Sequence, residues 1–251
     1  MDKIISRKNK LAMHMKKLGA SRSYRSLCRE YLCDGKKLLY DAVASDVTIS
    51  AVLTSSSLPA ELSPQVPVYC AERDIIDSIS PLKTPQDTLF ICKMDSEPTF
   101  DFTAGNHILL DGIQDPGNMG TIIRTADAFG FDSVILTGSC ADIYNPKTIR
   151  ASMGAIFRQK LFELTVPEIS DIKKSMRIVG TAPDRAYSSI SEVDLDNCII
   201  AVGNEGSGLS EAILNLCGEN FIIPIQDGCQ SLNAAAAAAV IMWESVRRRG
   251  S

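Results

Sequence analysis

The sequence predicts an α/β protein made of a small N-terminal α/β unit and a larger unit built on a mostly parallel sheet. In the second half of the 251-residue chain, apolar runs of strand length alternate with helix-like segments. Two such runs, Cys198 to Val202 and Phe221 to Ile225, end in glycine-rich or polar loops, as buried parallel strands do. A stretch without periodicity, from Asp95 to Gly105, has the composition of a linker. We therefore expect two domains, residues 1–97 and residues 98–251.

The predicted elements alternate along both domains. In the first domain we expect helices over Lys36 to Ala44 and Arg73 to Ser80, and strands over Val47 to Thr54, Val66 to Ala71 and Thr88 to Met94. In the second we expect further strands over His107 to Ile113, Ser133 to Thr137, Leu161 to Val166 and Arg177 to Thr181. The helices between them are expected over Gly120 to Phe129, Pro146 to Phe157, Glu168 to Ser175 and Ser210 to Cys217, with a last one starting in the alanine run after Asn233.

Composition limits the classes of protein to consider. Apolar residues make up 45% of the chain and charged residues 22%, which is ordinary for a globular protein. No apolar run approaches the roughly 18 to 20 residues of a membrane helix, and no apolar core follows the basic N-terminus as in a secretory signal, so we expect a cytoplasmic protein. The eight cysteines form no CxxC pair and are expected to be reduced. His14 and His107 lie far apart without a ligand cluster, so no metal site and no histidine-based triad is predicted.

Positive charge is concentrated at the N-terminus. Residues 1–37 hold eleven Lys or Arg and three acidic residues, whereas the whole chain has a net charge of −4. Tyr24 and Tyr31 lie among the basic residues as candidate stacking surfaces. A basic arm in an otherwise acidic chain predicts contact with a polyanion, above all nucleic acid. A solvated helix face and, because acids are scarce, a mitochondrial presequence are the alternatives.

Two loops that follow apolar runs hold candidate site residues. The loop Gly203 to Gly208 places Glu205 among glycines, which let a backbone approach a ligand closely. The second loop leads through Ser231 and Asn233 into the alanine helix. Because parallel strands deliver such loops to a shared edge, we expect a ligand site there. The structural alternative is a capped helix with Ser231 at the N-cap.

The first strand of the second domain also ends in a candidate loop. Its turn, Asp115 to Gly120, contains Asn118 and begins a helix that carries Arg124, whose guanidinium can reach an anion near the helix N-terminus. A turn asparagine and a surface arginine are the structural alternatives. No GxGxxG follows this strand and no GxxxxGK[ST] occurs, so ordinary dinucleotide and nucleoside-triphosphate sites are disfavoured.

Three long motifs occur in order: DPGNMGTIIRTADAFGFDSVIL, IIAVGNEGSGLS and IIPIQDGCQSLNAAAAAAVIMWE. They resemble the motifs of the SpoU (TrmH-like) family of the SPOUT superfamily, S-adenosylmethionine-dependent RNA ribose 2'-O-methyltransferases. The family's helix between the first two motifs is matched by NPKTIRASMGAIFR. Residues 5–44, which include SRSYR and DGKKLLYDA, resemble the N-terminal substrate-binding domain of two-domain members. The resemblance covers nearly the whole chain.

The resemblance implies a small α/β RNA-binding domain followed by a trefoil-knotted α/β domain, whose C-terminal segment threads a loop. It also implies a homodimer through the knotted domain, and no metal. By position, the S-adenosylmethionine pocket would be formed by Thr181, Gly203, Gly208, Ile223 and Leu232. The positions that match the family's catalytic site are Asn118, Arg124, Glu205, Ser231 and Asn233.

Two stretches depart from the family pattern. Cys33-Asp34-Gly35 stands where relatives often have Val-Glu-Gly, and Ala234 to Ala238 replace a mixture of Val, Ser and Ala. Neither departure removes a polar residue of the expected site. The alanines do change the helix packing that is expected beside the cofactor.

The implied chemistry accounts for the residue types. Methyl transfer needs an in-line approach of a ribose 2' oxygen to the sulfonium methyl, so positioning supplies much of the rate. Arg124 could bind the adjacent phosphate and stabilise negative charge on the 2' oxygen. An arginine is a poor base at neutral pH, and the roles of base and electrostatic clamp both stay open.

Other functions compete with this interpretation. One is an inactive RNA-binding knot protein, which the retention of Asn118, Arg124, Glu205 and Asn233 argues against. Another is an α/β enzyme with a different adenine-containing cofactor, which the missing dinucleotide fingerprint argues against. The N-terminal domain type favours ribosomal RNA over transfer RNA. The modified nucleotide, and a role in antibiotic resistance, stay open.

Overall fold

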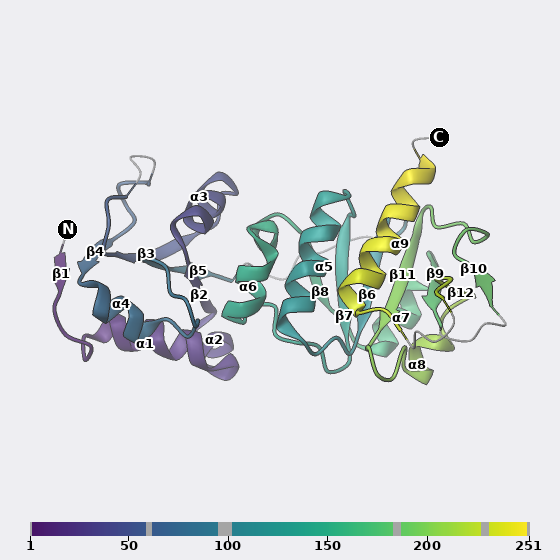
Figure 1. The fold of residues 1–251 in the computed structure, drawn as a ribbon, viewed down its shortest axis with the longest axis horizontal. Helices are drawn as coiled ribbons and strands as arrows, with labels where there is room; N and C mark the ends of the chain where they lie inside the picture. Colours follow the sequence, from purple (N-terminus) through teal and green to yellow (C-terminus); the bar gives the residue numbers. More distant parts are fainter. Residues whose placement is uncertain (1, 59–61, 95–101, 183–186, 227–230, 250–251) are drawn as a thin grey trace. The chain divides into compact units, whose positions relative to one another are not determined.

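The computed structural model describes residues 2–58, 62–94, 102–182, 187–226 and 231–249, and Figure 1 shows the fold. The chain forms two compact units, one of residues 1–96 and 142–158 and one of residues 97–141 and 159–251. Most of the expected linker, Asp95 to Gly105, and the expected boundary between residues 97 and 98 lie outside the described residues.

The first unit is built on a five-stranded mixed sheet in the order β1-β4-β3-β5-β2. Strand β3 pairs in parallel with β4 and antiparallel with β5, and β1 adds in parallel at the edge. The strands are β1 (Asp2–Ile4), β2 (Glu30–Asp34), β3 (Ile49–Thr54), β4 (Val68–Ala71) and β5 (Thr88–Lys93), and the helices are α1 (Lys10–Ala20), α2 (Arg22–Cys28), α3 (Lys36–Ala44) and α4 (Arg73–Ile79).

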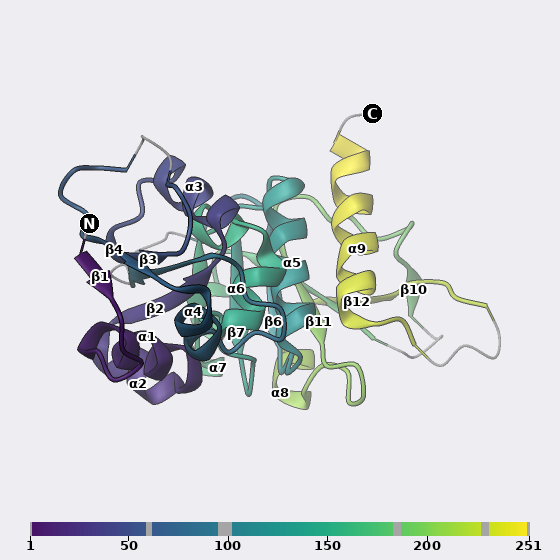
Figure 2. The same cartoon turned by 60° about the vertical axis from the view of Figure 1, so that its left-hand side comes forward.

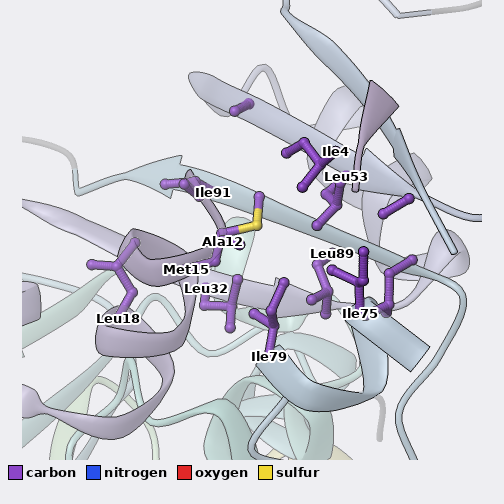
Figure 3. Packing of buried hydrophobic residues seen from close by; sticks show 13 residues of the cluster. Ile4, Ala12, Met15, Leu18, Leu32, Leu53, Ile75, Ile79, Leu89 and Ile91 are labelled. Carbon is purple, nitrogen blue, oxygen red and sulfur yellow. The ribbon is translucent and has the colours of Figure 1, made fainter. Parts of the chain in front are cut away.

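The core of this unit lies between the sheet and two helices, as Figure 3 shows. Met15 and Leu18 of α1 and Ile75 and Ile79 of α4 pack on sheet residues that include Leu89. On α1 the buried residues recur with helical spacing while its lysines remain exposed. The basic N-terminal segment is therefore part of the folded unit and not an arm ahead of it, because its apolar residues supply one wall of the core.

Residues 142–158 complete the first unit, although they lie between two strands of the second. They hold α6 (Pro146–Ser152) and a short 3-10 helix, η1 (Ala155–Phe157), where the sequence predicted one helix to Phe157. The helix breaks because Met153 and Gly154 adopt left-handed backbone, with φ of 50° and 88°. At Gly154 a β-carbon would lie 2.6 Å from a carboxylate oxygen of Asp41, so glycine allows the two segments to pack.

Arg25 anchors this segment. Its side chain is buried, it donates to the carbonyl of Leu18 at 2.5 Å, and it forms an ion pair with Asp142. The rings of Tyr31 and Tyr144 also stack, with their centroids 4.6 Å apart. A buried guanidinium needs such compensation, since the desolvation of an unpaired charge costs several kcal/mol.

The second unit is built on a seven-stranded sheet in the order β10-β12-β9-β11-β6-β7-β8, in which all described pairings are parallel. The strands are β6 (His107–Asp111), β7 (Ser133–Thr137), β8 (Leu161–Glu163), β9 (Arg177–Thr181), β10 (Ser188–Ser189), β11 (Cys198–Gly203) and β12 (Glu219–Ile222), and the helices are α5 (Pro116–Ala128), α7 (Val166–Ile172), α8 (Glu211–Leu214) and α9 (Ala234–Arg249). This sheet confirms the predicted α/β class. Threading of the C-terminal segment through a loop stays a prediction.

Helices pack on the sheet in two groups. Ile169 of α7 and Ile213 of α8 join a buried cluster with Leu109, Ile135 and Ile199 of the strands. Helices α5 and α9 pack against each other, and Figures 1 and 2 show both. Helix α5 contacts β7, and α9 contacts β11. All residues of β6, β7 and β11 are buried, which explains why these strands appear as unbroken apolar runs in the sequence.

Several element boundaries in the second unit differ from the prediction, among them the start of α5 and the ends of β6, β8 and β12. Helix α5 begins at Pro116, four residues before the expected start, since the Asp115 side chain accepts from the backbone N–H of Asn118 at 2.9 Å. Strand β12 ends at Ile222 and not at Ile225. Within the described ranges, no helix is long and apolar enough to cross a membrane.

Candidate active site

The candidate site lies where β6 and β11 end side by side in the second unit. Their register pairs Asp111, the last residue of β6, with Gly203, the last residue of β11. Asn118 follows β6, at the start of α5, and Glu205 follows β11 in the glycine loop. Two motifs that are far apart in the sequence therefore reach the same edge of the sheet.

Three predicted site residues form one hydrogen-bonded chain. The Asn118 side-chain amide donates from Nδ2 to Glu205 Oε1. The Asn233 amide donates from Nδ2 to Asn118 Oδ1 at 3.1 Å. The three expected motifs thus each contribute one residue to this amide chain, defined here as Asn233, Asn118 and Glu205.

The N-terminus of α9 sets the direction of the amide chain. Asn233 Oδ1 accepts from the backbone N–H groups of Ala235 at 3.0 Å and Ala236 at 3.3 Å. Its oxygen must face the helix, so its Nδ2 faces Asn118, and the Asn118 amide is oriented in turn with its nitrogen toward the carboxylate. Asn233, and not Ser231 as the structural alternative assumed, is the N-cap of α9.

The glycine loop closes on itself. Asn204 and Gly208 exchange two backbone hydrogen bonds of 3.0 and 2.8 Å. A β-carbon on Gly203 would overlap the backbone of Gly208 and Leu209, so glycine is required there by the chain itself. From the sequence this glycine was expected for the approach of a ligand, and its contact with the loop backbone is visible only in the structure.

A cavity of about 650 Å³ lies beside the loop. All five residues expected in the cofactor pocket line it: Thr181, Gly203, Gly208, Ile223 and Leu232. Glu205 and Ser231 of the expected catalytic set also line it. Glu205 therefore belongs both to the cavity wall and to the amide chain, which places the chain at the border of the cavity.

Arg124 is the expected site residue that the structure does not join to the others. It lies on α5, six residues after Asn118, and its side chain is exposed. It makes no hydrogen bond or ion pair with any residue in the described part of the chain. Its guanidinium is thus available to an anion from outside the unit.

Two residues near the site were not singled out from the sequence. Asp111 accepts from the backbone N–H of Ser210 at 2.7 Å, and Asn204 donates to the carbonyl of Gly112 at 3.0 Å. Both side chains join the end of β6 to the glycine loop. Their position at strand ends was a sequence signal that could have identified them.

Cys217 is not among the described residues that line the cavity. Burial raises the pKa of the Cys217 thiol to about 11, so it is protonated at neutral pH. Among the residues that the structure describes, no group of three or more His, Cys, Asp or Glu could hold a metal ion.

Comparison with known proteins identifies what the chain is similar to. Residues 105–243 match the model of the SpoU rRNA Methylase family. The 23S rRNA (guanosine(2553)-2'-O)-methyltransferase RlmP of Bacillus subtilis (strain 168) is 31% identical over 247 residues, which cover 97% of this chain and 98% of that protein.

Solved structures give the same match. The SpoU methyltransferase AviRb from Streptomyces viridochromogenes, in complex with the cofactor AdoMet, is 27% identical and superposes with a TM-score of 0.85 over 97% of this chain and 99% of its own. An rRNA methyltransferase from Sinorhizobium meliloti shares the fold, with a TM-score of 0.88, 24% identity and 98% of both chains covered.

Closure of the glycine loop generates a prediction. Replacing Gly203 with Ala should lower the free energy of unfolding by about 2 kcal/mol, because an overpacked methyl group forces the loop backbone apart. Gly206→Ala is the matched control, since a β-carbon there would meet only Asn204 Oδ1, at 3.5 Å. Urea unfolding of both variants makes the comparison. Equal stability of the two variants would contradict the internal role of Gly203.

Proposed function

The chain belongs to the SpoU rRNA methylase family, and we propose that Asn118, Arg124, Glu205, Ser231 and Asn233 form the catalytic site through which it methylates RNA. The protein is an S-adenosylmethionine-dependent methyltransferase that acts on a ribose 2'-hydroxyl of RNA. The proposal for the site rests on one observation above all. Glu205 lines the cavity and accepts from Asn118, so one carboxylate connects the cofactor pocket to the amide chain.

The cavity suits S-adenosylmethionine. Its volume of about 650 Å³ lies within the range of small-molecule sites. Ile223 and Leu232 give it apolar walls, and the glycine loop exposes main chain. Glu205 is the one ionisable residue among the described lining residues. Its negative charge complements a sulfonium, which fits a cationic cofactor better than an anionic nucleotide.

The bound cofactor supplies a methyl group carried on positively charged sulfur. Asn118 and Asn233 hold the Glu205 carboxylate at the cavity border, so the 2'-hydroxyl meets a preorganised acceptor there. Ser231 offers a second polar group in the same wall. Arg124 binds the phosphate next to the reacting ribose and stabilises negative charge that develops on the 2' oxygen. We assign Arg124 the role of electrostatic clamp, since a guanidinium stays protonated.

Ribosomal RNA is the proposed substrate. A relative that matches almost the whole chain is named a 23S rRNA methyltransferase. A transfer RNA substrate is the alternative, and the target nucleotide distinguishes the two. We propose the cytoplasm as the place of action, since ribosomal RNA is modified there in bacteria.

We propose that the N-terminal domain, residues 1–97 in the sequence-based division, binds the RNA. Of its cations, Lys3 and Arg7 pair with Glu72 and Asp74, and Arg25 is buried. Lys10 and Lys16 on α1 are exposed and have no ion-pair partner among the described residues. They supply positive charge for phosphate contacts.

We also propose that the protein forms a homodimer through the second unit. Val240 and Trp243 lie three residues apart on α9 and are 41% and 54% exposed. The Trp243 ring lies 5.9 Å from the ring of Phe129 at the end of α5, so the two helices share an apolar surface. An exposed apolar surface of this kind favours burial against a second copy.

The first prediction of this proposal concerns Arg124. Arg124→Ala should lower single-turnover methylation by about 10²-fold at saturating RNA, the size expected on loss of one electrostatic donor, with cofactor binding unchanged. Arg124→Lys should restore little, because it lacks the planar fork. Arg177→Ala, which removes an exposed arginine on β9, is the control.

The methylated nucleotide is mapped in parallel. Normal turnover of Arg124→Ala would remove this residue from the site, and absence of 2'-O-methylation by the wild type would refute the function.

The second prediction concerns RNA binding. Lys10→Ala and Lys16→Ala should each lower the slope of log binding constant against log salt by about 1, because fewer counterions are released. Point substitutions replace deletion of residues 1–37, since deletion would remove α1 from the core. Lys174→Ala is the control, because that lysine pairs with Asp171. An unchanged slope in the Lys10 and Lys16 variants would place the RNA elsewhere.

The third prediction concerns the dimer. Trp243→Lys should shift the protein to a monomer in sedimentation velocity, because it places a charge in the apolar surface. Tyr187→Lys, which changes another exposed aromatic residue of the second unit, should leave the dimer intact. A monomeric wild type at micromolar concentration would refute the proposal.

A further inference from the structure

Asn204 uses its side chain to shape the glycine loop. Its Oδ1 accepts from the backbone N–H groups of Gly206 at 2.9 Å and Ser207 at 3.3 Å. These are the first two residues after Glu205. One side-chain oxygen therefore holds the backbone on the C-terminal side of Glu205, while the backbone of Asn204 itself pairs with Gly208.

The same side chain ties the loop to the neighbouring strand end. Asn204 Nδ2 donates to the carbonyl of Gly112 at 3.0 Å, in the residue that follows β6. Asp111, the last residue of β6, accepts from the backbone N–H of Ser210 at 2.7 Å and is only 7% exposed. The end of β6 thus holds the loop at both of its ends.

This arrangement restricts Glu205. Its backbone lies between Asn204 and the two N–H groups that Asn204 binds, and its carboxylate accepts from Asn118. Asn118 is held in turn by Asn233 at the N-terminus of α9. The carboxylate is therefore positioned from its own backbone and from its hydrogen-bond donor at the same time.

We propose that Asn204 is a positioning residue for methyl transfer, which acts by holding the glycine loop so that the Glu205 carboxylate stays on Asn118. Asp111 supports it at the other end of the loop. This inference rests on the proposed function of Glu205 and extends it to Asn204 and Asp111, whose side chains form hydrogen bonds within the unit.

The donor and acceptor groups of the Asn204 side chain determine which substitutions test the proposal. An aspartate at position 204 keeps an oxygen for the N–H groups of Gly206 and Ser207 but cannot donate to the Gly112 carbonyl. A carboxylate oxygen about 3 Å from that carbonyl oxygen is repelled. Asn204→Asp therefore preserves the hydrogen bonds to Gly206 and Ser207 and breaks the hydrogen bond to Gly112. Asn204→Ala removes all of these bonds.

The experiment measures single-turnover methylation at saturating S-adenosylmethionine and RNA, together with cofactor affinity and melting temperature. Asn204→Asp should lower the rate about tenfold, the size of one lost hydrogen bond with an unsatisfied partner, and Asn204→Ala should lower it further. Asn215→Asp makes the same chemical change at an exposed position after α8 and should have no effect.

A double-mutant cycle separates positioning from a general loss of structure. In a Glu205→Gln background, Asn204→Asp should change the rate less than twofold, because its effect passes through the Glu205 carboxylate. A full tenfold effect in that background, or no effect of Asn204→Asp in the wild-type background, would overturn the inference. A rate unaffected by Glu205→Gln alone would refute instead the proposed role of Glu205.

Hydrogen exchange of the unliganded wild type gives a readout that does not depend on activity or on the folding of a variant. The backbone N–H groups of Gly206 and Ser207 should exchange at least tenfold more slowly than in an unstructured peptide, since Asn204 binds both. They should lose that protection in Asn204→Ala. Free exchange of both groups in the wild type would overturn the proposal.

Discussion

The parallel pairing of β6 with β11 is the constraint on which the candidate site depends. It places Asp111 next to Gly203, so the segments that follow the two strands leave the sheet at one edge. Asn118 and Glu205 meet there although 87 residues separate them in the sequence. A slip of this register by one residue would separate Asp111 from Gly203 and turn every side chain of the strand to the other face.

The amide chain gives the hydrogen bonds of the site one fixed direction. An asparagine side chain alone can present either its oxygen or its nitrogen to a partner. Capping of α9 by Asn233 removes that ambiguity, and the orientation passes through Asn118 to Glu205. The helix N-terminus, with its partial positive charge, lies at one end of the chain and a carboxylate at the other. Local helix capping thus polarises a site assembled from three distant segments.

Much of the fold could be predicted from periodicity, because buried strands and amphipathic helices leave clear patterns. Strands β7 and β9 and helix α3 have the bounds expected from the sequence. The position of residues 142–158 could not be predicted, since their contacts with Arg25 and Tyr31 are long-range and leave no periodic signal. The N-cap of α9 was misassigned because Ser231 and Asn233 are both good capping residues, and only the hydrogen bonds distinguish them.

The motifs located the candidate site, but the reasons for individual residues needed the structure. Gly203 was expected for its closeness to a ligand, whereas its β-carbon position is already filled by the backbone of Gly208 and Leu209. Asn204 lies between two residues that drew attention, and its own role is visible only from its four partners.

The placement of residues 142–158 in the first unit also has a consequence for synthesis on the ribosome. The first 96 residues emerge early, yet the Arg25 guanidinium has no carboxylate partner until Asp142 follows. A chain that grows by about 5 to 20 residues per second must therefore wait several seconds, during which β6 and β7 of the second unit are also made. The N-terminal unit finishes folding only after part of its successor has been translated.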